Sequence, residues 1–98
     1  MAKRKELTNF ENFIQLMDIA VRIPGGAPIE SIVADLGTTR TQVLRYIRKA
    51  KLKLNITIDP VFAGTAITHI MPRKADTETL EAMALSIEAS NHRSFTGA

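Results

Sequence analysis

The densest cluster of chemically active side chains in this sequence is a run of cations in residues 40–53. The six cations of this run are Arg40, Arg45, Arg48, Lys49, Lys51 and Lys53, and no Asp or Glu lies among them. A solvated helix face normally mixes both signs of charge, because opposite charges at positions i and i+4 stabilise the helix. Cations without such partners indicate a surface that binds a polyanion. The competing interpretation is a basic helix whose charges are only solvated.

The length and composition limit the class of protein that can carry this basic surface. The chain has 98 residues and a net charge of +3, which divides into +5 for residues 1–53 and −2 for residues 54–98. A chain of this size folds as one domain with a modest core, too small to frame a deep catalytic cleft. It contains no Cys, which excludes disulfides and thiolate metal sites and fits a reducing compartment. We therefore expect a cytoplasmic protein without a secretory signal or a membrane-spanning segment.

Three helices are predicted ahead of residue 54. Thr8 and Glu11 have the spacing of a capping box, and apolar residues then recur at helical intervals to about residue 22. Pro28 suits the first position of a short second helix, and Gly37 suits its end. Thr39 can cap the third helix, which is predicted to run to about residue 52.

The third helix is predicted to be amphipathic. At 100° per residue, Val43, Ile47 and Ala50 fall on one side, and Arg45 and Arg48 fall on the other. The apolar side is expected to pack in the core, so the basic side is expected to face outward. Tyr46 lies closer to the apolar side, and we expect it to pack rather than to stack on a base.

The period changes after the third helix and predicts a β-hairpin. Residues 55–58 alternate, residues 59–64 have turn chemistry, and residues 65–70 are rich in β-branched side chains. The register that puts most apolar side chains on one face sets Ile58 opposite Ala66, Ile56 opposite Thr68 and Leu54 opposite Ile70.

A last helix is predicted within residues 72–90, after a connector and a cap at Asp76 or Thr77. Its apolar stripe consists of Leu80, Met83, Ala84 and Ile87. This stripe can return to the domain's own core or pair with a second copy of the chain. We expect the second arrangement, a homodimer whose stripe is separate from the main core. Residues 1–7 are predicted to form a basic arm and residues 91–98 a flexible tail.

Residues 29–48 resemble the helix-turn-helix pattern. Ile32 and Leu36 precede the turn, Gly37 takes the glycine position, and Val43 and Ile47 take buried positions after it. With the hairpin included, residues 8–71 resemble the winged helix family. This resemblance implies an α+β fold, with a three-helix core and a β-hairpin wing, to which this chain adds a C-terminal helix.

The resemblance implies a sequence-specific regulator of transcription, a repressor, that binds double-stranded DNA. The third helix would contact base edges in the major groove, and the wing would touch the flanking backbone. Arg45 is the strongest candidate for a base contact, because it lies opposite the core stripe. The wing tip carries no Lys or Arg, so the alternative to a DNA contact there is a turn without a binding role. The full set of expected DNA contacts is Thr39, Arg40, Thr41, Gln42, Arg45, Arg48, Lys49, Lys51, Lys53, Gly64 and Thr65.

Two other functions use the same basic face. The chain can be an adaptor that docks an acidic protein, or an accessory DNA-binding protein of replication or recombination. An enzyme is not expected, because His69 and His92 lack the neighbours of a metal or catalytic motif. No cofactor, metal or small-molecule ligand is expected either.

Overall fold

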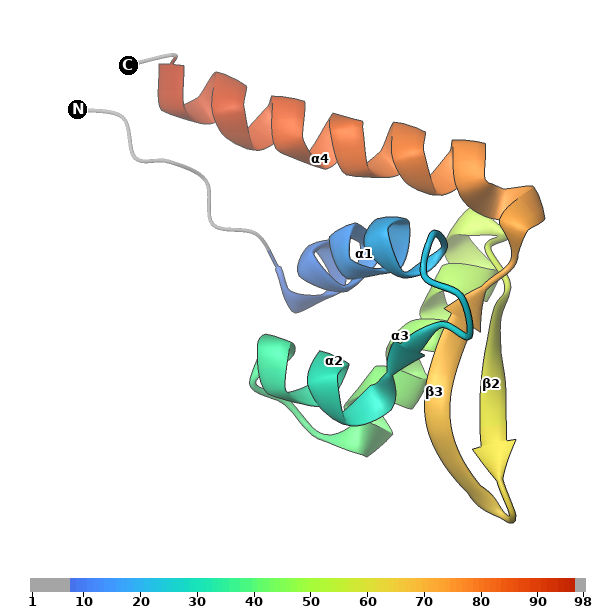
Figure 1. The fold of residues 1–98 in the computed structure, drawn as a ribbon. Coiled ribbons are helices and arrows are strands. Elements are labelled where there is room, and N and C mark those ends of the chain that lie inside the picture. Colours follow the sequence, from blue (N-terminus) through green and yellow to red (C-terminus); the bar gives the residue numbers. More distant parts are fainter. Residues whose placement is uncertain (1–7, 97–98) are drawn as a thin grey trace.

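The computed structural model of this chain describes the backbone of residues 8–96 and the side chains of residues 8–89. The predicted basic arm, residues 1–7, lies outside the described residues. In the described part, four α-helices and one 3₁₀ helix accompany a three-stranded antiparallel sheet, which makes the fold α+β (Figure 1). In chain order the elements are α1 (Asn9–Ala20), β1 (Ala27–Pro28), α2 (Ile29–Leu36), α3 (Arg40–Leu54), β2 (Ile58–Ala63), β3 (Ala66–Pro72), η1 (Lys74–Asp76) and α4 (Thr77–Thr96).

The first three helices begin and end close to where local chemistry predicts. Thr8 caps α1 with the complete capping box, in which its hydroxyl accepts from the Glu11 backbone and Glu11 accepts from the Thr8 backbone. α2 ends at Leu36, and Gly37 is its left-handed C-cap, as predicted. The Thr39 hydroxyl accepts a hydrogen bond from the backbone N–H of Gln42 at 3.2 Å and caps α3. α3 runs two residues further than expected and ends at Leu54.

The core lies between α1, α2, α3, α4 and the sheet. Its largest fully buried side chains include Phe13, Ile14, Met17, Ile29 and Ile70. Tyr46 packs here as predicted, with its ring centroid 5.6 Å from that of Phe13. Because Val43 and Ala50 of α3 are buried in this core, the opposite side of α3 faces outward.

The sheet has the order β1-β3-β2, so β3 is central. β1 is short and pairs Ala27 with Ile70. Gly26, just before it, has φ +83°, and a Cβ at this position would lie 2.5 Å from the carbonyl oxygen of Ile70. Only glycine fits this close approach without a shift of the backbone. Gly26 thereby lets the segment between α1 and α2 join the hairpin.

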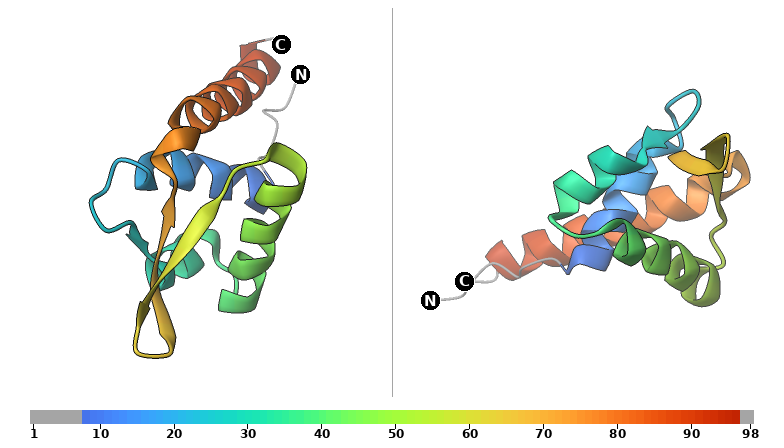
Figure 2. Two further views of the ribbon diagram at one scale, coloured as in Figure 1. Left: turned by 90° about the vertical axis from the view of Figure 1, so that its right-hand side faces the viewer. Right: turned by 90° about the horizontal axis from the view of Figure 1, so that it is seen from below.

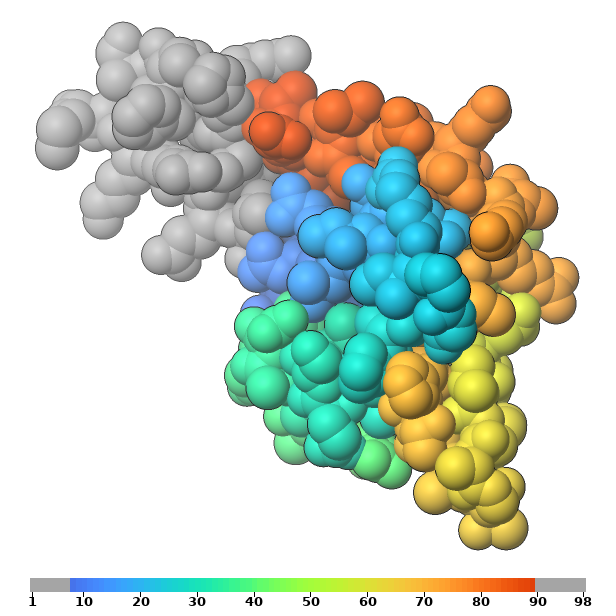
Figure 3. Space-filling view, in the orientation of Figure 1, coloured from blue at the N-terminus to red at the C-terminus, as the bar shows by residue number. Residues whose placement is uncertain are grey.

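The hairpin exists, but its predicted turn and register are wrong. β2 continues through Asp59 and Pro60, where the sequence predicted a turn, and Ile58 pairs with Pro72 rather than with Ala66. The strands reverse only at Gly64 and Thr65, and the hairpin stands out from the body of the molecule (Figures 1 and 3). Two further pairs of the predicted register fail because Leu54 still belongs to α3 and Ile56 lies in the connector before β2.

The edge position of β2 explains the wrong turn. Pro60 cannot donate a backbone hydrogen bond, which is why Asp59-Pro60 predicts a turn. In the outermost strand of the sheet, a position without an N–H can face solvent instead of a partner strand. Gly64 has φ +65°, which the first residue of a two-residue hairpin loop requires in a type II′ turn.

The packing of α4 differs from what was expected for its apolar stripe. Leu80 is fully buried and Ile87 is 7 % exposed, and both belong to the same core cluster as Phe13 and Met17. Met83 packs against this cluster, and Ala84 is half-buried. α4 lies along α1, opposite the hairpin tip (Figures 1 and 2). The expectation that this stripe is separate from the main core is therefore wrong, because α1 of the same chain covers it.

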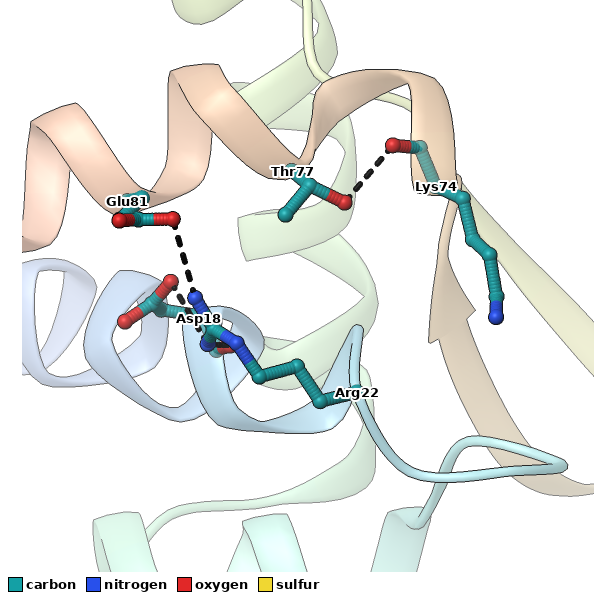
Figure 4. A network of polar contacts seen from close by, with 5 residues as sticks. All are labelled: Asp18, Arg22, Lys74, Thr77 and Glu81. Carbon is teal, nitrogen blue, oxygen red and sulfur yellow. Dashed lines mark hydrogen bonds and ion pairs between the residues drawn. The ribbon is translucent and has the colours of Figure 1, made fainter.

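α4 also extends beyond the predicted end of the helix. It continues to Thr96, so residues 91–96 continue the helix where a flexible tail was predicted, and residues 97–98 lie outside the described part. Arg22, at the C-terminal end of α1, forms ion pairs with Asp18 at 3.1 Å and with Glu81 of α4 at 3.2 Å (Figure 4). The hydroxyl of Thr77 donates to the carbonyl of Lys74 at the start of the same helix.

Candidate nucleic-acid interface

The candidate interface is centred on the outer face of α3. Val43 and Ala50 are fully buried, whereas Arg45 and Arg48 are exposed on the far side of the helix. This is the orientation that the helical periodicity predicted. Arg45 and Arg48 form no ion pair or hydrogen bond with other described residues. Their guanidinium donors are therefore available to an external acceptor.

The N-terminal end of α3 is partly neutralised. Arg40 forms an ion pair with Glu30 of α2, so its guanidinium already has a carboxylate acceptor within the chain. Thr39 uses its hydroxyl oxygen as the helix cap, while Thr41, two residues on, is exposed. Gln42 is half-buried. Of these four residues, Thr41 is the one whose side chain is both exposed and without a described partner.

Lys49 is placed differently from the two outward arginines. Its Nζ atom lies 4.4 Å from the ring centroid of Phe10, over the aromatic group that Phe10 forms with Phe13 and Tyr46. An ammonium group over an aromatic ring is attracted by the ring's electron density. Lys49 is thus directed toward α1, along one flank of α3.

The C-terminal end of α3 carries the last two predicted cations. Lys51 donates a hydrogen bond from Nζ to the hydroxyl of Thr57 at 3.3 Å, which ties the helix to the connector before β2. Lys53 is exposed and has no described partner. The six cations therefore do not form one uniform face, because Lys49 and Lys51 lean toward opposite flanks of the helix.

The hairpin tip is the second predicted contact surface. Gly64 and Thr65 form its exposed end, and the described tip carries no cation, as the sequence already shows. Phe62, next to the tip, is 57 % exposed. Sequence analysis missed Phe62 because its position was assigned to the predicted turn. The available signal was a large apolar side chain two residues before Gly64, inside the segment assigned to that turn. The tip thus offers backbone groups, one hydroxyl and an aromatic ring.

The fold brings these two surfaces to one end of the molecule. The N-terminal end of α3 and the hairpin tip point the same way, and α4 lies at the opposite end (Figures 1 and 2). Arg45 and Arg48 lie in the first three turns of α3, counted from its N-terminal end. Lys51 and Lys53 lie toward the other end of α3.

A groove between α3 and the base of the hairpin was also missed. It has a volume of about 660 Å³, and its lining includes Leu44, Leu52, Ile58, Arg48, Lys51 and Arg73. Leu52 is 78 % exposed and Leu44 38 %, and together they give this groove an apolar surface beside the cations. Arg73 pairs with Asp59 at 3.2 Å. The available signal was the pair of leucines, 44 and 52, that falls outside the core stripe of α3.

Among the described residues, no group of three or more His, Cys, Asp or Glu is placed to hold a metal ion. Within the same part of the chain, no helix combines the length and the apolar character needed to cross a membrane. Family models, curated proteins and solved structures were each compared with the chain, and none of them matches it.

Proposed function

We propose that this chain is a winged helix protein that binds double-stranded DNA in a sequence-specific manner and regulates transcription as a repressor. The order α1, β1, α2, α3, β2, β3 and the sheet order β1-β3-β2 are compatible with this family. α3 would lie in the major groove, and the hairpin would be the wing. The hydrogen-bonding groups on α3 and the position of the hairpin supply the two contacts that this arrangement needs.

One observation carries the proposal: Arg45 and Arg48 are exposed and have no partner in the described part of the chain. They lie in the first three turns of α3, whose N-terminal end points the same way as the hairpin tip (Figure 2). A guanidinium group can donate two parallel hydrogen bonds to the O6 and N7 atoms of guanine. Arg45 is assigned to a base edge and Arg48 to a phosphate or base at the edge of the contact. Lys53 would add a phosphate contact that holds the helix without selecting a sequence.

The hairpin tip would touch the DNA beside this site. It has no cation, so its contribution would come from the backbone N–H groups and hydroxyl near Gly64 and Thr65 and from the exposed ring of Phe62. An apolar side chain that inserts at a minor groove kinks the DNA, but it does not neutralise the charge of the phosphates. The wing is therefore expected to affect DNA shape more than the salt dependence of binding.

The test is selection of bound sequences from a random pool of double-stranded DNA at about 150 mM salt, where non-specific attraction is partly screened. The expected result is an enriched motif whose enrichment is lost in Arg45→Ala. Arg22→Ala is the matched control, because it removes one exposed cation from the opposite end of the molecule.

Two results would contradict the proposal. One is a folded wild-type protein that enriches no sequence. The other is an equal loss of binding in Arg45→Ala and in Arg22→Ala, because the binding would then follow net charge alone. Either result would favour the adaptor function, in which the same face docks an acidic protein.

A further inference from the structure

Two exposed surfaces of this chain have opposite charge and a leucine at the centre. The first is the groove beside α3, hereafter the basic groove, in which Leu44 and Leu52 lie among Arg48, Lys51 and Arg73. Phosphate gains nothing from the aliphatic part of this lining, because apolar surface is stabilised by covering it with other apolar groups. The basic groove therefore suits an apolar side chain with carboxylates around it.

The second surface is the outer face of α4, hereafter the acidic face. Its centre is Leu85, which is 60 % exposed and points away from the side of α4 that covers α1. Glu81 and Glu88 lie four residues before and three residues after it, and both are exposed. Glu88 and Glu78 form no ion pair with other described residues, and Glu81 shares the half-exposed Arg22.

We propose that the acidic face of one copy of this chain docks into the basic groove of a second copy. Leu85 would cover Leu44 and Leu52, and the carboxylates would meet the cations of the groove. Burial of the leucines would supply affinity, and the charges would set the orientation. The opposite signs are already visible in the chain, which carries +5 in residues 1–53 and −2 in residues 54–98.

The two surfaces belong to different parts of the chain, so each copy has one of each. A contact between unlike surfaces is heterologous, and it can continue from one copy to the next. This contact differs from the homodimer predicted from the sequence, whose stripe is buried against α1. The contact would occupy Arg48, which the proposed function assigns to DNA, but neither Arg45 nor the hairpin tip lines the basic groove. The contact does not depend on the proposed binding of DNA.

The experiment measures the mass of the full chain by sedimentation equilibrium, without DNA, as a function of protein and salt concentration. The wild type is expected to associate, and less strongly as salt increases. Leu52→Glu places an acid in the basic groove, and Leu85→Arg places a cation on the acidic face. Each is expected to weaken association about tenfold or more, as truncation of a central contact does.

A mixture of the two variants gives the sharpest readout. The Leu85→Arg chain keeps its basic groove and the Leu52→Glu chain keeps its acidic face, so an equimolar mixture is expected to recover a one-to-one complex. Ile19→Glu is the matched control, because Ile19 is an α1 residue of similar exposure, 58 %, outside both surfaces. It is expected to leave association unchanged. If either charged variant unfolds, Leu52→Gln and Leu85→Gln replace it with a milder change.

The proposed contact is overturned if the wild type stays monomeric up to millimolar concentration. A monomeric wild type that binds an acidic peptide instead of a second copy overturns it too. It is also overturned if the variants of Leu52 and Leu85 associate like the wild type, or if their mixture recovers nothing. Self-association that responds as expected, in a protein that selects no DNA sequence, would keep this contact and reject only the proposed function.

Discussion

α3 and α4 are both amphipathic helices that bury their apolar stripes in the same core, yet their outer faces carry opposite charge. α3 buries only Val43 and Ala50 completely and exposes a basic face with free arginines. α4 buries Leu80 and Ile87 against the domain and exposes an acidic face around Leu85. The comparison teaches that periodicity identifies the side of a helix that must be covered, but does not identify what covers it.

The largest expected effect tests the buried side of α4. Leu80→Ala removes a fully buried side chain from the core, and such a change costs about 2–5 kcal/mol of stability. Leu85→Ala, on the same helix, should stay within about 0.5 kcal/mol because its side chain is exposed. Urea unfolding followed by circular dichroism measures both. Equally small losses of stability in both variants would mean that α4 does not belong to the core. They would favour the prediction from the sequence, in which the stripe of α4 pairs with a second copy of the chain.

The next effect tests the outer side of α3. If the proposed function holds, Arg45→Ala is expected to weaken binding to the selected DNA site by about 1–3 kcal/mol and to relax one base preference. Arg40→Ala should have a smaller effect, because Glu30 already neutralises Arg40. Titration of the selected site and of a scrambled duplex measures the difference. A loss that is the same on both duplexes would move Arg45 from base contact to phosphate contact.

Sequence predicts best what local chemistry determines. The capping box of Thr8, the cap at Thr39 and the end of α2 at Gly37 all depend on residues within a few positions of each other. The outward direction of Arg45 followed from the spacing of Val43 and its neighbours alone, because a helix has a fixed period. These features are present in the structure as predicted.

Features that depend on distant partners were predicted less well. Pro60 was assigned to a turn because the position of β2 at the edge of the sheet depends on its pairing with β3, which the local sequence does not indicate. Leu80 was assigned to a second copy because nothing near it in the chain identifies α1 as its partner. The basic groove needs α3 and Arg73 together, and residues 55–72 separate them in the sequence. Each failure concerns a contact between elements rather than an element.

A smaller effect tests the start of α3 as a local feature. Thr39→Ala removes the hydroxyl that accepts the backbone N–H of Gln42 and is expected to cost about 1 kcal/mol of stability. Thr39→Ser keeps a hydroxyl and should restore nearly all of it. Thermal and urea unfolding measure the two variants. A loss that serine does not restore would assign the effect to the methyl group of Thr39 instead of the cap.

The smallest effect tests whether charge or apolar contact holds α4 on the domain. Arg22 joins Asp18 of α1 to Glu81 of α4, but its side chain and that of Glu81 are each about half exposed to water. Exposed ion pairs contribute about 0.2–1 kcal/mol, and salt screens them. A double-mutant cycle of Arg22→Ala and Glu81→Ala should therefore give a coupling energy below about 1 kcal/mol that falls as salt increases. A coupling as large as the loss in Leu80→Ala would reverse the comparison, because α4 would then be held by its charged edge and its apolar stripe would be secondary.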